Sequence, residues 1–147
     1  MPDKVGIRGT EKRRFIDELP FCRAMNMVLE DVGEGTAVVS MPWNDRLVGD
    51  PVTGVAHGGA VSALLDTCGG VAVLSHPAKP ATTATLNFRI DYMRPATPGQ
   101  TITAHATCFH LTRTIAFVRT LATDEDKANP VATATGAFVV QASATSP

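Results

Sequence analysis

The sequence contains few cysteines, almost no net charge and no long hydrophobic run. Its 147 residues have a formal net charge of −1, so the chain lacks the basic face that general nucleic-acid and membrane-surface binders use. No apolar run reaches the roughly 18 residues of a membrane span. The polar start, Met1-Pro2-Asp3-Lys4, has no signal-peptide core. These absences predict a cytoplasmic protein with no nucleic-acid or membrane partner.

Metal ligands and paired cysteines are also missing. The cysteines are odd in number, and neither they nor the histidines have the spacings usual for metal ligands. We therefore expect no metal site, no cofactor, and reduced, buried thiols. The residues considered are Cys22, Cys68, Cys108, His57, His76, His105 and His110.

What remains is the composition of one globular domain. Hydrophobic residues make up 44% of the chain and charged residues 18%, which excludes disorder. At this length, residues 1–147 form one domain rather than two. The segment Thr10–Leu19 predicts a short helix capped by Thr10 and stopped by Pro20, within a helical extension over residues 1–24. Residues 142–147 predict a frayed tail.

Most of the remaining chain predicts strands. Two short runs, Met25–Asp31 and Thr36–Trp43, flank a glycine-rich turn and predict a hairpin, and Asn44–Thr53 predicts a loop. Four later runs are rich in Thr, Val, Ile and Phe: Thr82–Met93, Thr101–Leu111, Thr114–Thr123 and Val131–Gln141. Their short connections favour antiparallel neighbours that run up and down. We expect an α+β fold with one antiparallel sheet curled around a single helix.

That helix is the most informative segment of the chain. Gly54–Leu74 is almost entirely apolar, with apolar residues at three- and four-residue steps and Ser62, Asp66 and Gly70 on another face. Placing a carboxylate in such a wall costs several kcal/mol unless it is paired, hydrogen-bonded or protonated. Proteins accept that cost most often at functional sites. Asp66 is therefore a candidate catalytic residue, with an ion pair to an arginine across a subunit interface as the alternative.

Two glycines stand at the entrance of the same helix. Gly58 and Gly59 let a ligand approach the backbone where unpaired N–H groups and the positive end of the helix dipole collect. Tight packing explains the glycines equally well. A donor site at the helix mouth and a carboxylate two turns inside would form half of an acyl-transfer site. The preceding His57 is interpreted as capping or orienting the loop, with proton transfer as the alternative.

Three motifs resemble the hotdog-fold acyl-CoA thioesterases of the phenylacetate-degradation type, over about Met25–Val140. The first is His57-Gly58-Gly59 followed by Asp66, nine residues after the histidine. The second is Phe88-Arg89-Ile90-Asp91-Tyr92-Met93-Arg94-Pro95, which resembles a strand ending in an aromatic residue, an arginine and a proline. The third is Arg113-Thr114-Ile115-Ala116-Phe117-Val118.

The resemblance implies a thioester hydrolase with the hotdog fold, in which a curled sheet wraps one long central helix. It implies that the Gly59 amide polarises the thioester carbonyl and that Asp66 activates water or attacks the acyl carbon directly. The two groups would come from different subunits of a homodimer, or of a dimer of dimers, whose sheets join edge to edge. Coenzyme A would enter only as part of the acyl-CoA substrate.

The resemblance also assigns supporting residues. A hydroxyl on the strand after the helix, counted back from Tyr92, falls on Thr85, with Thr83 as the alternative. Related proteins often carry an asparagine six residues before the histidine, where this chain has Pro51. The residues expected to bind substrate are Gly58, Ser62, Arg94 and Arg113. The two arginines would meet the coenzyme A phosphates, unless they are simply solvated.

The sequence leaves two questions about function open. The first is whether the chain catalyses hydrolysis or is an acyl-CoA-binding regulator or non-catalytic hotdog subunit. The second is which acyl group is bound. Ala60, Ala63, Ala84 and Thr85 are small residues near the expected site, and they leave room for an aryl group or a medium-length chain.

Overall fold

The long apolar segment forms one helix, α3 (Gly58–Leu74), in the computed structural model, which describes residues 16–142. His57 caps its start and Ser75 its end, close to the predicted limits. One side of α3 is buried, including Leu64, Leu65 and Cys68. Its opposite stripe, which carries Asp66 and Gly70, is only half-buried. The sheet of a single chain therefore leaves one face of the helix partly open.

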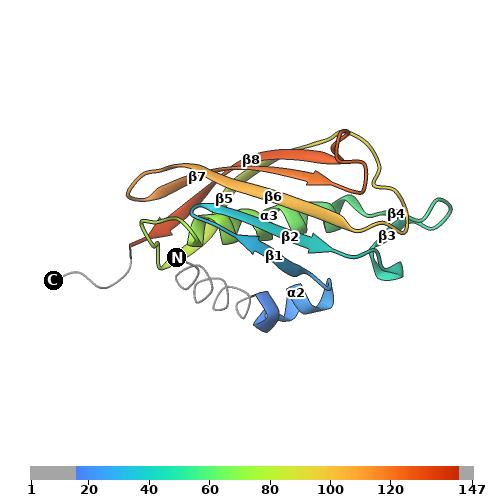
Figure 1. The fold of residues 1–147 in the computed structure, drawn as a ribbon, viewed down its shortest axis with the longest axis horizontal. Coiled ribbons are helices and arrows are strands. Elements are labelled where there is room, and N and C mark those ends of the chain that lie inside the picture. Colours follow the sequence, from blue (N-terminus) through green and yellow to red (C-terminus); the bar gives the residue numbers. More distant parts are fainter. Residues whose placement is uncertain (1–15, 143–147) are drawn as a thin grey trace.

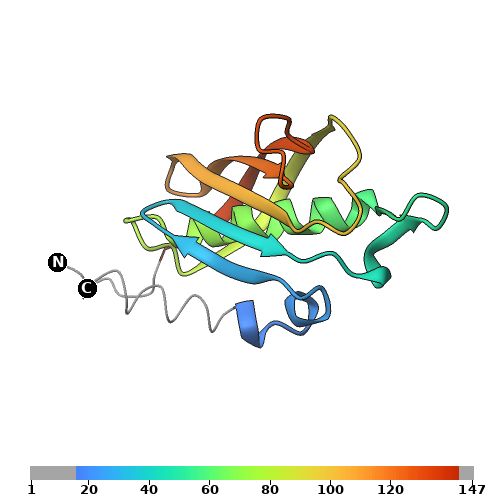
Figure 2. The same cartoon turned by 45° about the vertical axis from the view of Figure 1, so that its right-hand side comes forward.

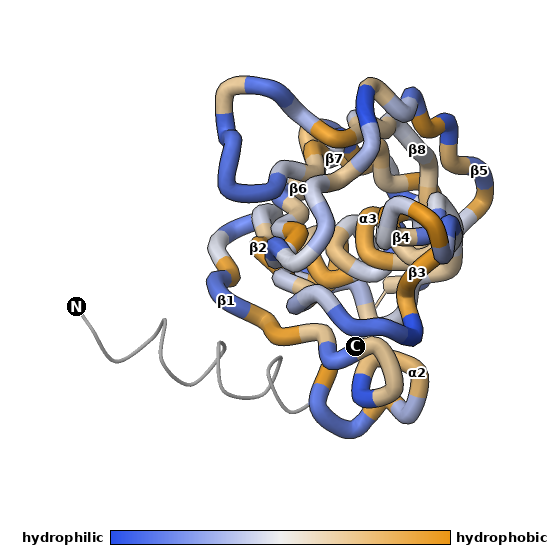
Figure 3. Tube along the Cα trace, turned by 90° about the vertical axis from the view of Figure 1, so that its right-hand side faces the viewer, coloured by the Kyte–Doolittle hydropathy of each residue, from blue (hydrophilic) through white to orange (hydrophobic). Residues whose placement is uncertain are grey.

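Six strands form one antiparallel sheet around this helix (Figure 1). They are β1 (Val28–Val32), β2 (Thr36–Met41), β5 (Thr82–Tyr92), β6 (Ile102–Leu111), β7 (Ile115–Thr123) and β8 (Ala132–Gln141). The predicted hairpin and all four later strands are present, with ends shifted by a few residues. Figure 3 shows these strands as an arc around α3. The predicted α+β hotdog architecture is thus confirmed.

The order of the strands differs from a simple up-and-down sheet. It runs β1-β2-β6-β7-β8-β5, so β5 and β6 follow each other in the chain but lie apart in the sheet. Strand β5 instead pairs with β8 along its whole length, from Thr82 opposite Gln141 to Tyr92 opposite Ala132. The expectation that short connections make all four strands sequential neighbours is wrong. The segment between Met93 and Thr101 is long enough to carry the chain away from β5 and back to β2.

The predicted loop at Asn44–Thr53 contains regular structure. A short 3-10 helix, η1 (Asp45–Leu47), is followed by a small hairpin of β3 (Val48–Asp50) and β4 (Val55–Ala56). The side chain of Asp50 accepts hydrogen bonds from Val52 N and Thr53 Oγ1 and so fixes the turn. Gly54 has a φ of +78°, a conformation that glycine adopts without strain. Local side-chain bonds thus order a segment that composition alone predicted to be irregular.

The described part of the N-terminal segment, residues 16–24, lies next to β1 in the view of Figure 2. Residues 16–18 are helical and a second short helix, α2 (Pro20–Ala24), follows. The first helix ends at residue 18, in agreement with the predicted stop at Pro20, and Pro20 itself begins α2, because proline at the first helical position loses no hydrogen bond. Ile16 and Cys22 are buried. The Thr10 cap, the first part of the predicted helix and residues 143–147 of the predicted tail lie outside the described residues.

Strand β5 forms one edge of the sheet and is largely exposed. Leu86 and Tyr92 on this strand are 57% and 54% exposed, and no strand of the described chain covers the outer edge of β5. Exposed edges of this length invite pairing with another chain. Within residues 16–142, no helix has both the length and the apolar character needed to cross a bilayer.

Candidate active site

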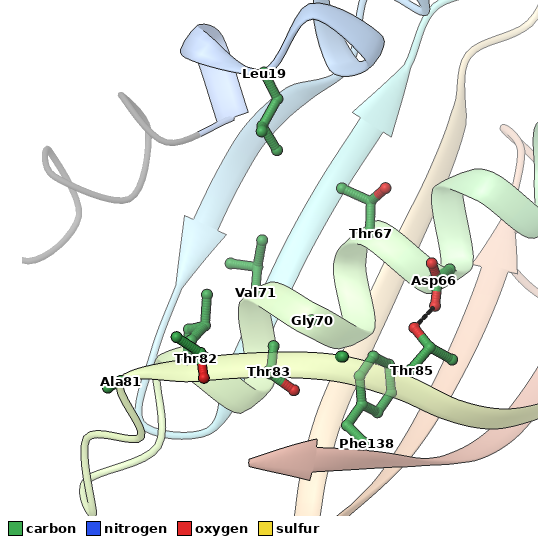
Figure 4. Close-up of a pocket in the computed structure, with 12 residues that line it drawn as sticks. Leu19, Asp66, Thr67, Gly70, Val71, Ala81, Thr82, Thr83, Thr85 and Phe138 are labelled. Carbon is green, nitrogen blue, oxygen red and sulfur yellow. Dashed lines mark hydrogen bonds between the residues drawn. The ribbon is translucent and has the colours of Figure 1, made fainter. Parts of the chain in front are cut away.

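Asp66 and Thr85 meet where α3 crosses β5. Thr85 Oγ1 donates a 2.6 Å hydrogen bond to Asp66 Oδ1 (Figure 4). Asp66 is half-buried on the open stripe of α3, and Thr85 is exposed on the edge strand. The structure therefore brings together the carboxylate and the hydroxyl that the sequence singled out, and Thr83 does not contact Asp66 in this way. A carboxylate held by one hydroxyl keeps its second oxygen available for a substrate or a water molecule.

A pocket of about 370 Å³ opens beside this pair. It runs along α3 from Asp66 toward the end of the helix, between the helix and the first residues of β5 (Figure 4). Its walls are mainly apolar, with Leu19, Val71, Leu74 and Phe138 as the large side chains. Pockets of this size and character are typical of small-molecule sites, in which a few polar groups orient an otherwise apolar ligand.

The start of α3 shows what His57 does. Its Nδ1 accepts a 2.7 Å hydrogen bond from the Gly59 N–H, and its carbonyl accepts one of 2.9 Å from the Ala60 N–H. His57 Nδ1 thus acts as the acceptor that caps the helix. The Gly59 amide, which the resemblance assigns to the substrate carbonyl, is occupied by this cap. It becomes available to a ligand only if His57 shares or releases it.

A second pocket, of about 400 Å³, lies beside the same end of the helix. Gly58, Tyr92, Met93 and Pro95 are among its lining residues. The Tyr92 hydroxyl donates a 3.0 Å hydrogen bond to the Gly58 carbonyl and so ties the end of β5 to the helix start. The two pockets therefore lie at opposite ends of the open face of α3.

Arg94 has a structural role. Its guanidinium forms a bidentate ion pair with Asp124, with N–O distances of 2.6 and 2.8 Å. Its remaining N–H groups donate to the carbonyls of Asn129 and Pro95, so all five of its donors are used within the chain. The prediction that Arg94 binds coenzyme A phosphates is therefore not supported. The Asp124 side chain is fully buried, and the Arg94 hydrogen bonds hold its pKa below the usual range.

Arg113 and Ser62 are the two remaining residues predicted to contact the substrate. Arg113 is exposed in the β6–β7 turn. The carbonyl of the next residue, Thr114, bonds to Val140, which pairs with Thr83 in the pocket wall. Arg113 is thus at the end of the sheet that carries the first pocket. Ser62 lies on the Asp66 face of α3, and its hydroxyl donates to the Gly59 carbonyl.

The position where related proteins often carry an asparagine supplies no replacement side chain at Asp66. Pro51 lies in the exposed β3–β4 turn. Asn44 accepts from Arg46 N with its side chain and caps η1. Neither Pro51 nor Asn44 forms a hydrogen bond with Asp66. Among the described residues, the partner of Asp66 is Thr85.

The cysteines have the packing role predicted for them. All three are free and buried, and burial raises the pKa of the Cys68 thiol to about 12. Such a thiol is protonated at neutral pH and is a poor nucleophile. Within residues 16–142, no group of three or more His, Cys, Asp or Glu side chains is placed to hold a metal ion.

Sequence reasoning missed several residues of the first pocket. Leu19, Gly70 and Phe138 line it but come from three distant parts of the chain. The adjacent glycines of α3 were the available signal, since a Cβ at Gly69 would lie 3.0 Å from the Phe138 ring. These glycines allow the ring to approach the helix backbone closely.

A family model described as the thioesterase superfamily matches residues 53–131, more than half of the chain. The chain belongs to the thioesterase superfamily. The matched region includes the His57-Gly58-Gly59 motif, Asp66 and Thr85, so the family assignment covers the proposed catalytic residues. The resemblance inferred from the motifs is confirmed at this level.

Two relatives align with different shares of this chain. A candidate esterase from Halobacterium salinarum is 33% identical over 85 residues, and the match spans 56% of each protein. The chain thus spans little more than half the length of this relative. The medium/long-chain acyl-CoA thioesterase YigI of Escherichia coli K12 is 24% identical over 139 residues, covering 86% of this chain and 88% of YigI.

Solved structures share the fold. A Pseudomonas aeruginosa protein superimposes with a TM-score of 0.79 at 32% identity, over 89% of this chain and 97% of that one. The phenylacetic acid degradation protein PaaI of Thermus thermophilus, solved as a point mutant, gives a TM-score of 0.73 at 30% identity. That match covers 82% of this chain and 98% of PaaI.

Proposed function

We propose that this protein hydrolyses acyl-CoA thioesters to the free acid and coenzyme A. The observation that carries the proposal is the hydrogen bond from Thr85 to Asp66 at the mouth of an apolar pocket. A carboxylate oriented in this way can serve as a general base toward a thioester whose acyl group lies in the pocket. Family membership and the similarity to YigI, which is named as an acyl-CoA thioesterase, support the same chemistry.

In the proposed reaction, Asp66 takes a proton from water while the water oxygen bonds to the thioester carbonyl carbon. The carbonyl oxygen becomes an oxyanion, which accepts a hydrogen bond from the Gly59 N–H after His57 has shared or released it. The C–S bond then breaks, and the proton held by Asp66 passes to the leaving thiolate. Direct attack by the carboxylate is the alternative, in which water hydrolyses the resulting anhydride.

The site is proposed to be shared between two copies of the chain. Gly59 and Asp66 are seven residues apart on α3, or about 10 Å along the helix axis. The attacking atom and the oxyanion donor must each lie about 3 Å from the reacting carbonyl. One helix does not bring its own Gly59 and Asp66 that close, so the donor is expected from a second copy.

Pairing of two β5 edges would produce this arrangement. A two-fold axis makes the two strands antiparallel, so contacts are reciprocal. If the axis passes Asn87, the middle residue of β5, then Thr82 lies opposite Tyr92 of the second copy. Because Tyr92 is bonded to Gly58, the start of one α3 then lies beside the pocket of the other chain. Arg113 remains the candidate contact for the coenzyme A phosphates.

Thiol release measured with a panel of acyl-CoA thioesters tests the proposal. The Asp66→Asn variant keeps the shape of the side chain, so fold and coenzyme A affinity should remain while turnover falls by at least about two orders of magnitude. Near wild-type turnover in the variant would contradict the role of Asp66. Tight acyl-CoA binding by the wild type with no thiol release would favour the alternative, an acyl-CoA-binding regulator or non-catalytic subunit.

A further inference from the structure

Two residues that line the pocket beside Asp66, Leu19 and Phe138, lie outside the range that the thioesterase family model matches. Leu19 lines the pocket from the short segment just before α2, whereas the family match begins at residue 53. Its side chain points toward the face of α3 that carries Thr67 and Val71 (Figure 4). Leu19 is half-buried and packs against the core. The segment is held in place by Ile16 and Cys22, which are 0% and 2% exposed.

The floor of the same pocket is kept open by a missing side chain. A Cβ placed on Gly70 would lie 4.0 Å from both the Phe138 ring and the Thr83 methyl group, so it would meet ordinary contacts and occupy pocket space. Thr83 presents its methyl rather than its hydroxyl to this position. Phe138 is 2% exposed and packs edge-on against Phe88, with ring centroids 5.9 Å apart. The floor of the pocket, around Gly70 and Phe138, is therefore apolar and well packed.

The length of the pocket indicates the class of acyl group. It follows α3 from Asp66 to Leu74, eight residues that rise about 12 Å along the axis. Carbon–carbon bonds of about 1.5 Å at about 111° advance an extended chain by roughly 1.25 Å per carbon, so the pocket matches roughly nine or ten carbons. An apolar groove of this length exceeds what a single aromatic ring fills.

We infer that this pocket binds the straight aliphatic chain of a medium-length acyl group, and that Leu19 is the side wall that limits the passage of longer chains beyond Thr67 and Val71. The inference rests on the proposed thioester hydrolysis, because Asp66 defines which end of the chain carries the thioester. Leu19 is a specificity-determining residue and touches no reacting atom. The exposed side of the pocket, along Ala81, Thr82 and Ala84, is the side that a second copy covers in the proposed dimer.

Two opposite substitutions at this wall test the inference. Leu19→Ala enlarges the pocket and should move the best substrate toward longer chains, while Leu19→Trp fills it and should move the best substrate toward shorter ones. Both keep the backbone bonds from Leu19 N to Ile16 and from Arg23 N to Leu19. Single methylene changes in apolar pockets alter kcat/KM by about tenfold or more, so octanoyl-CoA, which fits the wild-type pocket, should lose at least that much with Leu19→Trp while butanoyl-CoA is unchanged.

The measurement is kcat/KM for acetyl-, butanoyl-, octanoyl-, dodecanoyl-, hexadecanoyl- and phenylacetyl-CoA. Phe21→Ala is the matched control, because Phe21 belongs to the same segment, is 54% exposed and does not line the pocket. Its chain-length profile should equal that of the wild type. Gly70→Ala is a second, independent variant, expected to fold and to disfavour the longer chains. If Leu19→Ala does not fold, Gly70→Ala and Leu19→Trp still test whether this pocket sets the chain-length preference.

Binding of the same thioesters to the Asp66→Asn variant separates the two proposals. Thiol release by the wild type with a length profile unaltered by Leu19 or Gly70 substitutions would overturn this inference and leave the proposed function standing. Chain-length-dependent binding that shifts with Leu19, without hydrolysis of any thioester, would overturn the proposed function and keep the pocket assignment. A preference for phenylacetyl-CoA over every aliphatic thioester would overturn the aliphatic assignment.

Discussion

At the scale of single residues, the hydroxyl of Thr85 is the contact that orients Asp66. The 2.6 Å bond from Thr85 Oγ1 to Asp66 Oδ1 crosses from the edge strand to the helix, and both residues lie near solvent. An Asp side chain without this partner rotates more freely, and small losses of orientation are costly in catalysis. Thr85 is therefore a positioning residue in the proposed reaction.

We predict that Thr85→Val, which has the same shape without the hydroxyl, lowers kcat by about tenfold with little change in KM. Thr85→Ser is the matched control and should restore most of the activity, because it retains the donor. Steady-state kinetics with one acyl-CoA thioester gives both parameters. Equal kinetics for the Val and Ser variants would show that the hydroxyl has no part in turnover.

The geometry of His57 favours helix capping over proton transfer. Its Nδ1 caps α3 by accepting from Gly59 N, and loss of an N-cap costs about 1 kcal/mol of stability. We predict that His57→Ala lowers the free energy of unfolding by about this amount, and that His57→Asn, which retains a capping side chain, does not. Urea denaturation measures the difference.

Turnover in the same two variants separates capping from proton transfer. If His57 only caps the helix, His57→Asn should keep near wild-type kcat. A fall comparable to that of Asp66→Asn, in a variant of unchanged stability, would assign proton transfer to the imidazole.

At the scale of elements, the Arg94–Asp124 pair joins the end of β5 to the turn between β7 and β8. Asp124 is fully buried and Arg94 is 25% exposed. Removal of one partner leaves a buried charge without compensation, at a cost of about 3 kcal/mol. We predict this loss for Arg94→Gln in urea denaturation at neutral pH, with no change in KM for acyl-CoA.

The pH dependence of stability follows from the same pair. Hydrogen bonds from Arg94 lower the pKa of Asp124 below its ordinary value of 3.8. A carboxyl group with a lowered pKa in the folded state stabilises the fold fully above the unfolded value, and this stabilisation is lost as the pH falls below it. The wild type should therefore lose stability below about pH 4 more steeply than Asp124→Asn.

For the Arg94→Gln variant, a raised KM with unchanged stability would instead restore the phosphate-binding role of Arg94.

Elements were predictable from the sequence where local pattern decides them. The spacing of apolar residues gave α3 nearly to the residue, and β-branched residues gave the strands, because both signals reside within the segment itself. The resemblance placed the supporting hydroxyl on Thr85, but its hydrogen bond to Asp66 was not predicted from the sequence. The ion pair of Arg94 was not predicted, because its partner Asp124 lies 30 positions away in the sequence. No local pattern distinguishes an arginine that is solvated from one that is fully paired.

Non-local packing also explains the other misses. Strand β5 pairs with β8 rather than with the next strand in the chain, and the side chain of Leu19 reaches α3 from a segment almost fifty residues earlier. Pairing partners of this kind depend on how the whole sheet closes around the helix. The sequence predicts that α3 is covered, but it does not say which residues cover each side.

At the scale of the whole molecule, one chain leaves both the edge of β5 and one stripe of α3 open. The proposed dimer covers the two surfaces together, because they adjoin each other along the first pocket (Figure 4). The chain should therefore behave in solution as at least a dimer. A monomeric mass at micromolar concentration with activity intact would exclude a site shared between subunits.

A shared site also predicts that two inactive variants rescue each other. Asp66→Asn lacks the carboxylate, and Gly59→Val adds bulk at the amide, where even a Cβ would lie 2.8 Å from His57 Nδ1. In a heterodimer of the two, one site combines an intact Gly59 from one chain with an intact Asp66 from the other, and the second site carries both defects. Unfolding and remixing equal amounts gives about half heterodimers, so about one quarter of all sites should become functional. Native mass spectrometry confirms that heterodimers have formed, and thiol release reports activity. Heterodimers that remain inactive would show that the two groups do not meet across an interface, and the proposed reaction would then need a different donor for the oxyanion.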